Sequence, residues 1–377
     1  MKTIAIDAVG IDRVGGGRTS ILSLLRYIFA LDQETRYLVL VSEYEVALKS
    51  FSNVRQIIVP IANRFAARIY LQIMLPILVQ REQVNLVHFA KNLGVIGLSC
   101  PYLVTVHDLT VLHLREYYSL VDVVYWRLIE PLTVRYAAKV IAVSQDTARD
   151  IRKFYRVSEQ NISVIPWAPQ EQFVPIRDSS ILEALRQRYS LPDQYLLFVG
   201  ILAKKKNLPT LLKAFALLRS QHTDVPDLVV IGRRYPQSDD NLSVHLVHEL
   251  GLDAHVHFIG SVPDEDLPLF YNGAKLYVLP ALHEGFGIPC LEAMACGVPV
   301  VTTRVGAIPE VVGDAALLVN DPLDFVELCA SIERALYDDA LRREMTQRGL
   351  KRASDFSWKK SAQKMLDIYH SLLNYGE

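Results

Sequence analysis

The chain has 377 residues, of which 51% are hydrophobic and 21% charged, and its formal net charge is −1. This length exceeds what one hydrophobic core usually supports, so two domains of an ordinary globular protein are expected. Neither the charge nor an interleaving of aromatic with basic residues supports nucleic-acid binding. No window reaches the roughly 18 uninterrupted apolar residues that a membrane-spanning helix needs.

Short runs rich in Val, Ile and Leu alternate with helix-length amphipathic stretches along the chain. In the first half the runs are 3–9, 37–41, 55–59, 85–89, 102–106 and 139–143. In the second half they are 195–199, 228–231, 256–259, 276–279, 298–302 and 316–319. Such runs indicate parallel strands buried on both faces. Two series in succession predict two doubly wound α/β domains rather than one barrel.

The rhythm breaks at residues 164–169, where Pro166 and Pro169 disfavour a helix. This segment is the predicted hinge between a first domain, 1–165, and a second domain, 170–357. Residues 358–373 have helical apolar spacing and predict a terminal helix. Periodicity alone does not say against which domain that helix packs.

The two halves differ in charge. Residues 1–165 carry 19 Lys and Arg against 14 Asp and Glu, whereas the remainder carries 21 against 27. The excess is concentrated in residues 51–100, and the basic, apolar-rich stretch 63–80 belongs to it. Two interpretations of this stretch stay open: contact with an anionic membrane surface, and a solvated helix face.

Two motifs of the first half have residue types suited to a binding site. The strand 102–106 ends in His107 and Asp108. The histidine could bond a sugar hydroxyl, and the aspartate could orient it or cap a turn. Gly15, Gly16 and Gly17 predict a loop after the first strand that suits close approach to phosphate or acceptor, although a glycine run alone is weak evidence.

The first signal of the second half follows strand 195–199. Lys204, Lys205 and Lys206 stand at the predicted mouth of that strand, before a helix over 209–219. Their charge can neutralise a diphosphate without a metal ion. A run of charged residues by itself more often marks a solvated turn. Because this run directly follows a predicted parallel strand, ligand binding is the favoured interpretation.

The strongest signal is the loop between the strand at 276–279 and a helix starting near Pro289. Gly285 and Gly287 let a ligand approach the backbone, and the amides with the helix dipole favour a phosphate. Glu284 and Glu292, the latter expected in the first helical turn, bracket this loop and could accept sugar and ribose hydroxyls. The alternative is that Glu284 is a solvated loop residue and Glu292 merely complements the helix dipole.

Other features narrow the range of functions. No P-loop lysine motif, zinc-ligand pattern or Gly-x-Ser-x-Gly elbow occurs in the sequence. The triplet Asp264, Glu265 and Asp266 opens a helix over 267–272 and is expected to cap it rather than hold a metal. The four cysteines indicate buried thiols of a reducing compartment. Met1 and Lys2 lead directly into the strand-like run 3–9, which argues against a secretory signal. We therefore expect a cytoplasmic protein, with peripheral contact at the inner face of the plasma membrane left open.

These motifs resemble the retaining glycosyltransferases of family four, which have the GT-B fold. Residues 284–292 match the family's Glu-x7-Glu signature, and further matching pieces are 105–109, 140–144, 199–200, 206–208, 256–262, 306–310 and 313–316. The resemblance spans nearly the whole chain and implies two Rossmann-like domains facing a central cleft. It also implies that the terminal helix, 358–377, returns to the first domain.

The resemblance implies a role for each matching residue. Glu284 would face the donor sugar, Glu292 would hold the ribose hydroxyls, and Lys205 and Lys206 would contact the diphosphate. His107 would lie near the transferred sugar, and Ser261 with its neighbours would edge the nucleobase. The predicted catalytic residues are His107, Glu284 and Lys206. The predicted donor-binding residues are Gly16, Gly17, Lys205, Lys206, Gly260, Ser261, Val262, Glu284, Gly285, Phe286, Gly287, Ile288 and Glu292. Where many members have Arg, this chain has Ile201, and where some have Arg it has Lys205, which loses the bidentate fork.

The expected reaction is metal-independent hexose transfer from a nucleotide-diphosphate sugar to a polysaccharide or lipid-linked glycan, with no cofactor. UDP-glucose is the first expectation for the donor and GDP-mannose the second. Because no second carboxylate stands where a nucleophile would, same-face attack is favoured. Two alternatives stay open: a nucleotide-sugar epimerase or hydrolase of the same fold, and a catalytically silent sugar-nucleotide-binding protein.

Overall fold

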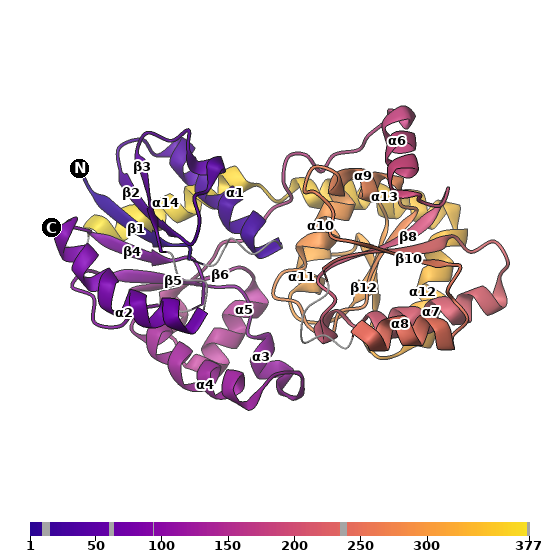
Figure 1. Ribbon diagram of the computed structural model, residues 1–377, viewed down its shortest axis with the longest axis horizontal. Coiled ribbons are helices and arrows are strands. Elements are labelled where there is room, and N and C mark those ends of the chain that lie inside the picture. The colour runs from indigo at the N-terminus through magenta and orange to yellow at the C-terminus, as the bar shows by residue number, and fades with distance from the viewer. Residues whose placement is uncertain (10–15, 60–63, 93, 234–239, 375–377) are drawn as a thin grey trace. The chain divides into compact units, whose positions relative to one another are not determined.

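The computed structural model describes residues 1–9, 16–59, 64–92, 94–233 and 240–374 (Figure 1). The chain divides into two compact units. The first unit comprises Met1–Trp167 together with Ser357–Glu377, and the second comprises Ala168–Phe356. In the described part of the chain no helix has the length and apolarity needed to cross a membrane.

The first unit is built on a seven-stranded parallel sheet with the order β3-β2-β1-β4-β5-β6-β7. Its strands are β1 (Thr3–Asp7), β2 (Arg36–Val41), β3 (Val54–Ile58), β4 (Leu86–Phe89), β5 (Tyr102–Val106), β6 (Lys139–Ala142) and β7 (Ile162–Val164). The sequence did not predict β7, which pairs with β6 at the edge of the sheet. Its three half-buried residues are too few to show the apolar run that identified the other strands.

Helices cover both faces of this sheet. The helical elements of the first unit are α1 (Gly16–Leu31), η1 (Val46–Leu48), α2 (Arg64–Arg81), α3 (Thr110–His113), η2 (Arg115–Tyr117), α4 (Leu120–Arg135), α5 (Gln145–Asp150), η3 (Ile151–Tyr155), η4 (Glu159–Asn161) and α14 (Trp358–Asn374). The inward residues of α2 and α4 belong to one core cluster with the sheet.

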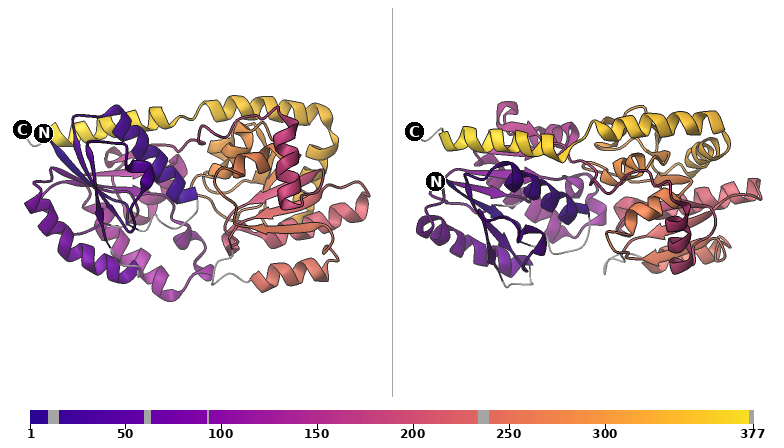
Figure 2. Two further views of the ribbon diagram at one scale, coloured as in Figure 1. Left: turned by 45° about the horizontal axis from the view of Figure 1, so that its top comes forward. Right: turned by 90° about the horizontal axis from the view of Figure 1, so that it is seen from above.

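The terminal helix α14 packs against α1 and β4, and Figure 2 shows it beside α1 in both views. The Tyr369 hydroxyl lies 2.6 Å from Nδ1 of His88, whose Nε2 lies 2.8 Å from the Thr105 hydroxyl. Burial lowers the pKa of His88 to about 3, so this histidine is neutral. The Ser361 hydroxyl also donates to the Pro166 carbonyl oxygen at 2.6 Å. These buried polar contacts fix the helix to the sheet of the first unit.

The second unit has a six-stranded parallel sheet with the order β10-β9-β8-β11-β12-β13. Its strands are β8 (Tyr195–Val199), β9 (Asp227–Ile231), β10 (Val256–Gly260), β11 (Leu276–Leu279), β12 (Val300–Thr303) and β13 (Ala316–Val319). Its helical elements are α6 (Ser179–Tyr189), η5 (Lys204–Lys206), α7 (Leu208–Gln221), α8 (Asp240–Glu249), α9 (Leu267–Gly273), α10 (Ile288–Ala295), α11 (Ile308–Val312), α12 (Phe325–Tyr337) and α13 (Asp339–Ser354).

Local sequence explains where many of these elements begin. Four helices of the second unit, α7, α9, α10 and α11, carry proline at their start, where the missing N–H would have no helical partner. The strands β1, β5, β8 and β11 are buried along their whole length, as their unbroken apolar runs predict. The predicted fold class, two doubly wound parallel sheets, is confirmed.

Two local predictions were wrong. Gly16 and Gly17 do not form a loop but begin α1, while Gly15 lies outside the described residues. Asp266 stands at the N-cap of α9, yet its carboxylate does not cap the helix. It accepts hydrogen bonds from Arg188 at 3.1 Å and from the Tyr189 hydroxyl at 2.6 Å. The cationic partner on α6 is a stronger competitor for this carboxylate than a backbone amide.

Candidate functional site

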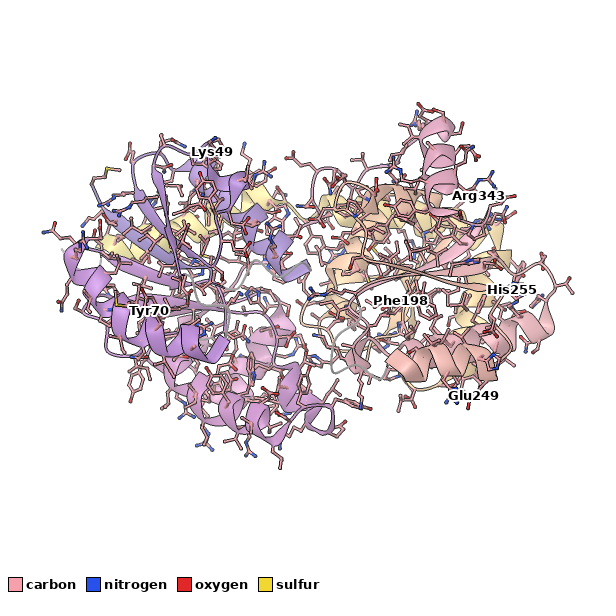
Figure 3. All side chains as sticks on the ribbon, viewed as in Figure 1. Lys49, Tyr70, Phe198, Glu249, His255 and Arg343 are labelled. Atoms are coloured by element: carbon pink, nitrogen blue, oxygen red, sulfur yellow. The ribbon has the colours of Figure 1, made fainter. Side chains whose placement is uncertain are left out.

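The candidate site of the second unit lies where its strand order reverses. β8 pairs with β9 on one side and with β11 on the other, so the connections leave β8 and β11 in opposite directions. A crevice forms outside the carboxyl ends of parallel strands at such a switch point. The segments that follow these two strands contain Lys206 and Glu284. Phe198, labelled in Figure 3, belongs to the fully buried part of β8 that supports them.

Lys206 and Glu284 form a close ion pair although 78 positions separate them. Nζ of Lys206 donates to Oε1 of Glu284 at 2.5 Å, and the two side chains are only 12% and 11% exposed. Attraction between opposite charges is strengthened where water is largely excluded. The two predicted catalytic residues of this unit therefore lie together, in a place where an incoming anion or hydroxyl could exchange partners with them.

Backbone contacts hold the two loops together. The Leu282 N–H donates to the Lys205 carbonyl oxygen at 2.8 Å, so the loop after β11 rests on the turn η5. Asn207, which directly follows the lysines, donates from its side chain to the carbonyl oxygens of Pro280 and Pro322 at 3.0 and 2.7 Å. Asn207 was not predicted as a site residue, although its position after the lysine run was a usable signal. These two hydrogen bonds hold the residue after Lys206 against the loops that contain Pro280 and Pro322.

The loop after β12 supports Glu284 from a third side. The Ala307 N–H donates to the Glu284 carbonyl oxygen at 2.9 Å. Gly306 has a φ of +52°, and a Cβ there would overlap that same carbonyl oxygen. Only glycine adopts this conformation cheaply and leaves room for the contact. The backbone of Glu284 is thus held independently of its carboxylate.

The remaining predicted residues of the loop lie at the start of α10. Gly287 is the N-cap residue of this helix and Ile288 its first residue. Phe286 is buried and its ring lies edge-on to Phe356, with centroids 5.8 Å apart. The first amides of a helix lack helical partners, so the N-terminal end of α10 is a place that suits an anion.

Glu292 lies beyond the first turn of α10 and is buried, so the prediction that it stands in the first helical turn was wrong. The Tyr271 hydroxyl donates to its Oε2 at 3.1 Å. Burial raises the pKa of Glu292 to about 7, against the opposing effects of Tyr271 and Lys206. A buried carboxyl that changes charge near neutrality is not a dipole-complementing surface residue. Tyr271 was not anticipated from the sequence.

A glycine stands at, or directly after, the end of three neighbouring strands of this sheet. Gly200 follows β8, Gly232 follows β9, and Gly260 ends β10. The Gly200 N–H bonds the Ile231 carbonyl oxygen and the Gly232 N–H bonds the Gly260 carbonyl oxygen, both at 2.9 Å. A Cβ on Gly232 would overlap the Gly200 carbonyl oxygen. The missing side chain of Gly232 thus makes room for the backbone of the neighbouring strand, whereas a Cβ on Gly260, which Ser261 and Val262 follow, would have no atom within 4 Å. Gly232 was missed, although a glycine after each strand could have identified it.

His107 follows β5 in the first unit, as predicted. Its Nε2 donates to the Ala90 carbonyl oxygen at 2.7 Å, which leaves Nδ1 as a hydrogen-bond acceptor. Nδ1 is buried and has no hydrogen-bond partner among the described residues. Burial lowers the pKa of this histidine, which keeps it neutral. The backbone of His107 is held by Asn92, whose Oδ1 accepts its N–H at 2.9 Å. Asp108 accepts from the Thr110 N–H at 3.1 Å and so caps a turn.

The site residues fall into two groups. Lys206, Glu284, Glu292, the glycine edge and the start of α10 belong to the second unit, whereas His107, Gly16 and Gly17 belong to the first. Within the second unit the arrangement offers a buried ammonium, two carboxylates that can accept hydroxyl hydrogens, and the N-terminal end of α10. Such a set can bind a phosphorylated ligand that also carries hydroxyl groups.

Two family descriptions match the chain in succession. "Glycosyltransferase Family 4" matches residues 14–168, and "Glycosyl transferases group 1" matches residues 183–352. O-antigen chain mannosyltransferase B of Escherichia coli is 34% identical over 269 residues, which are 71% of this chain and 70% of that protein. Serotype-specific mannosyltransferase WbdA of Escherichia coli is 31% identical over 243 residues, 64% of this chain but only 30% of WbdA.

A solved structure agrees with the whole fold. Sucrose-phosphate synthase from Thermosynechococcus elongatus superposes with a TM-score of 0.81 at 22% identity, covering 100% of both chains. At this identity the likeness establishes the fold alone, which is GT-B. With the family matches and the mannosyltransferase relative, the resemblance expected from the Glu-x7-Glu segment is confirmed, and the chain belongs to the retaining glycosyltransferases of family four.

Proposed function

We propose that this glycosyltransferase moves mannose from GDP-mannose onto a growing polysaccharide, with retention of configuration and without a metal ion. The observation that carries the proposal is the buried Lys206–Glu284 pair at the switch point between β8 and β11. An ammonium and a carboxylate side by side match a donor that presents a diphosphate next to sugar hydroxyls. The diphosphate takes the ammonium, and the hydroxyls donate to the carboxylate.

The reaction follows from where charge develops. As the bond between the anomeric carbon and the phosphate oxygen breaks, the sugar becomes positive and the departing diphosphate gains negative charge. Lys206, Lys205 and the amides of residues 285–287 stabilise that negative charge, and such preorganised electrostatics is usually a large part of catalysis. The acceptor oxygen forms its bond on the same face, and its proton passes to the departing phosphate oxygen.

His107 and Glu292 complete the proposed roles. The unpaired Nδ1 of His107 is a neutral acceptor for a substrate hydroxyl, and its fixed tautomer removes the need to reorient the ring. Glu292 accepts the ribose hydroxyls, and the glycine edge at 260–262 accommodates the base. Gly16 and Gly17, at the start of α1, are proposed to approach the diphosphate or the acceptor.

The names of the relatives favour mannose. Both Escherichia coli proteins are described as mannosyltransferases, and one of them acts on the O-antigen chain. We therefore propose GDP-mannose before UDP-glucose, which reverses the order expected from the sequence alone. A polysaccharide acceptor is favoured by the same relatives. The matched segment covers 70% of one relative but 30% of the other, so the proposal rests chiefly on the first.

Thermal unfolding with a panel of nucleotide-sugars tests the donor. A ligand at 100 times its Kd adds about 2.7 kcal/mol to the free energy of unfolding. We expect GDP-mannose and GDP to raise the melting temperature and UDP-glucose and UDP to leave it unchanged. The opposite pattern would make UDP-glucose the favoured donor.

Product analysis tests the reaction class. With GDP-mannose and a mannan oligosaccharide, we expect a product that is one hexose longer, and an unchanged rate after dialysis against EDTA. An epimerised donor formed without acceptor would instead support the epimerase alternative. If the donor raises the melting temperature but is not cleaved with any acceptor tried, the alternative of a sugar-nucleotide-binding protein is supported.

A further inference from the structure

Helix α2 of the first unit is apolar on two opposite faces. Its inward face consists of Ala67, Leu71, Leu75 and Val79, which are spaced by four residues and buried in the core. A second stripe with the same spacing, Ile69, Ile73 and Ile77, is exposed, with 60% of Ile73 accessible. Tyr70 and Met74 widen it, and Tyr70 is labelled in Figure 3. A surface helix normally places polar residues on this outward face.

Helix α4 repeats this departure from the usual pattern. Its exposed residues Leu120, Val124, Leu128 and Leu132 recur every fourth position, and Leu120 and Leu128 are 83% and 61% accessible. Val121 and Ile129 extend the stripe. The inward side of α4 contains Val134, which belongs to the same core cluster as the inward residues of α2. Both helices therefore cover the same face of the sheet, as Figure 1 shows, and turn apolar stripes away from it.

Cations outnumber acids around the two stripes. The sequence of α2 contains no acidic residue, and its outward stripe continues into the exposed Arg81. On α4 the exposed Arg127 and Arg135 lie on or beside the stripe. Of the two acids of this helix, Glu130 is fully buried and Asp122 accepts from the Ser119 hydroxyl at 2.7 Å. The exposed apolar surface is thus bordered by cations.

We propose that this outward surface of α2 and α4, here called the α2–α4 face, docks on a lipid bilayer that contains anionic lipids. Apolar side chains enter the boundary between headgroups and acyl chains, while the arginines reach the anionic headgroups with their aliphatic parts along the apolar surface. The exposed isoleucines favour this proposal over the solvated-face interpretation of residues 63–80. A symmetric contact with a second copy would bring arginines against arginines, which disfavours a dimer.

Vesicle flotation of the full chain tests this proposal. Vesicles of phosphatidylglycerol and phosphatidylcholine are compared with pure phosphatidylcholine at 0.1 M and 0.5 M salt. The test variant carries Ile73→Glu, Val124→Glu and Leu128→Glu, which are all exposed. The matched control carries Val244→Glu, Leu323→Glu and Val326→Glu, which are exposed residues of the second unit and change the net charge equally. A second variant, Arg81→Gln with Arg127→Gln, removes charge and leaves the apolar stripes intact.

We expect wild type and control to float with anionic vesicles and the test variant to bind at least tenfold more weakly. Each removed arginine should weaken binding about fivefold, and 0.5 M salt should do the same to wild type. Equal binding of test variant and wild type, equal loss in the control, or no binding by wild type would each overturn the proposal. So would light scattering that finds a wild-type dimer dissociated by the test variant without vesicle binding, because a second copy would then occupy the face. If the test variant does not fold by circular dichroism, the arginine variant decides.

Discussion

In the first unit β1 lies between β2 and β4, and in the second unit β8 lies between β9 and β11. Both switch points hold a buried ion pair, but the residues come from different places. In the first, Asp7 ends β1, is 2% exposed, and pairs with Arg68 of α2 at 3.0 Å. In the second, Lys206 and Glu284 both stand in segments beyond the strand ends. The same strand order thus places different side chains at the two switch points.

The partners of the two acids explain the difference. The Asp7 carboxylate also accepts from the Val9 N–H at 3.1 Å, so it is bound both to α2 and to the backbone just after β1. The hydrogen bond of the Lys206 ammonium goes to the Glu284 carboxylate, and Glu284 stands just before the start of α10. We infer that the first pair stabilises the unit, whereas the second is arranged for exchange with a ligand. The predictions below test this contrast, from the largest effect to the smallest.

Lys206→Ala and Glu284→Gln should each lower kcat on the order of 10³-fold, because the departing diphosphate loses its cation or the sugar loses its acceptor. Initial rates with saturating donor measure this. Lys213→Ala, an exposed lysine of α7, is the control and should change kcat less than twofold. Near-normal rates in both site variants, with circular dichroism unchanged, would defeat the assignment.

Asp7→Asn should lower the stability of the first unit by about 3 kcal/mol, because it removes the buried carboxylate that pairs with the Arg68 guanidinium. The change in kcat per folded molecule should be small. Urea unfolding followed by circular dichroism measures the stability. Asp146→Asn breaks an exposed pair with Arg149 and should cost less than about 1 kcal/mol. A catalytic loss in Asp7→Asn as large as that in Glu284→Gln would remove the contrast between the two crevices.

Gly306→Ala should cost about 2 kcal/mol and lower kcat by roughly tenfold to a hundredfold, because the new Cβ displaces the backbone of Glu284. Gly251→Ala is the matched control. Its φ of +66° imposes similar backbone strain, but no atom lies within 4 Å of the added Cβ. Melting temperature and kcat are measured for both. Equal losses of activity in the two variants would show that strain, and not the position of Glu284, is responsible.

Donor affinity should rise about tenfold from pH 6 to pH 8. The pKa of Glu292 is raised to about 7, so the carboxyl is protonated below this pH and ionised above it. Only the ionised form accepts hydrogen bonds from both ribose hydroxyls, so protonation competes with nucleotide binding. Calorimetric titration with GDP across this range measures the slope. Glu292→Gln should bind more weakly and independently of pH; a slope that persists in this variant would assign the titration to another group.

Of the thirteen strands in the described residues, the sequence indicated twelve within one or two residues, because most are short runs rich in apolar residues between amphipathic helices. It failed at β7, which is short and lies at an edge, and at Gly16 and Gly17, where local preference favoured a loop. It also pointed to His107 in the first unit and to Lys206, Glu284 and Glu292 in the second, because these residue types stand in segments that follow the carboxyl ends of parallel strands.

What the sequence by itself determined is the alternation of strands and helices, since side-chain periodicity and helix-start prolines act over a few neighbouring residues. What only the tertiary structure decided is the state of the site. The Lys206–Glu284 pair spans 78 positions, the tautomer of His107 depends on the Ala90 carbonyl, and the pKa of Glu292 depends on the burial of its side chain. The outward stripes of α2 and α4 are likewise distinguishable from their inward stripes only once the sheet covers one of the two. Burial and long-range pairing arise from the packed chain, and no local pattern encodes them.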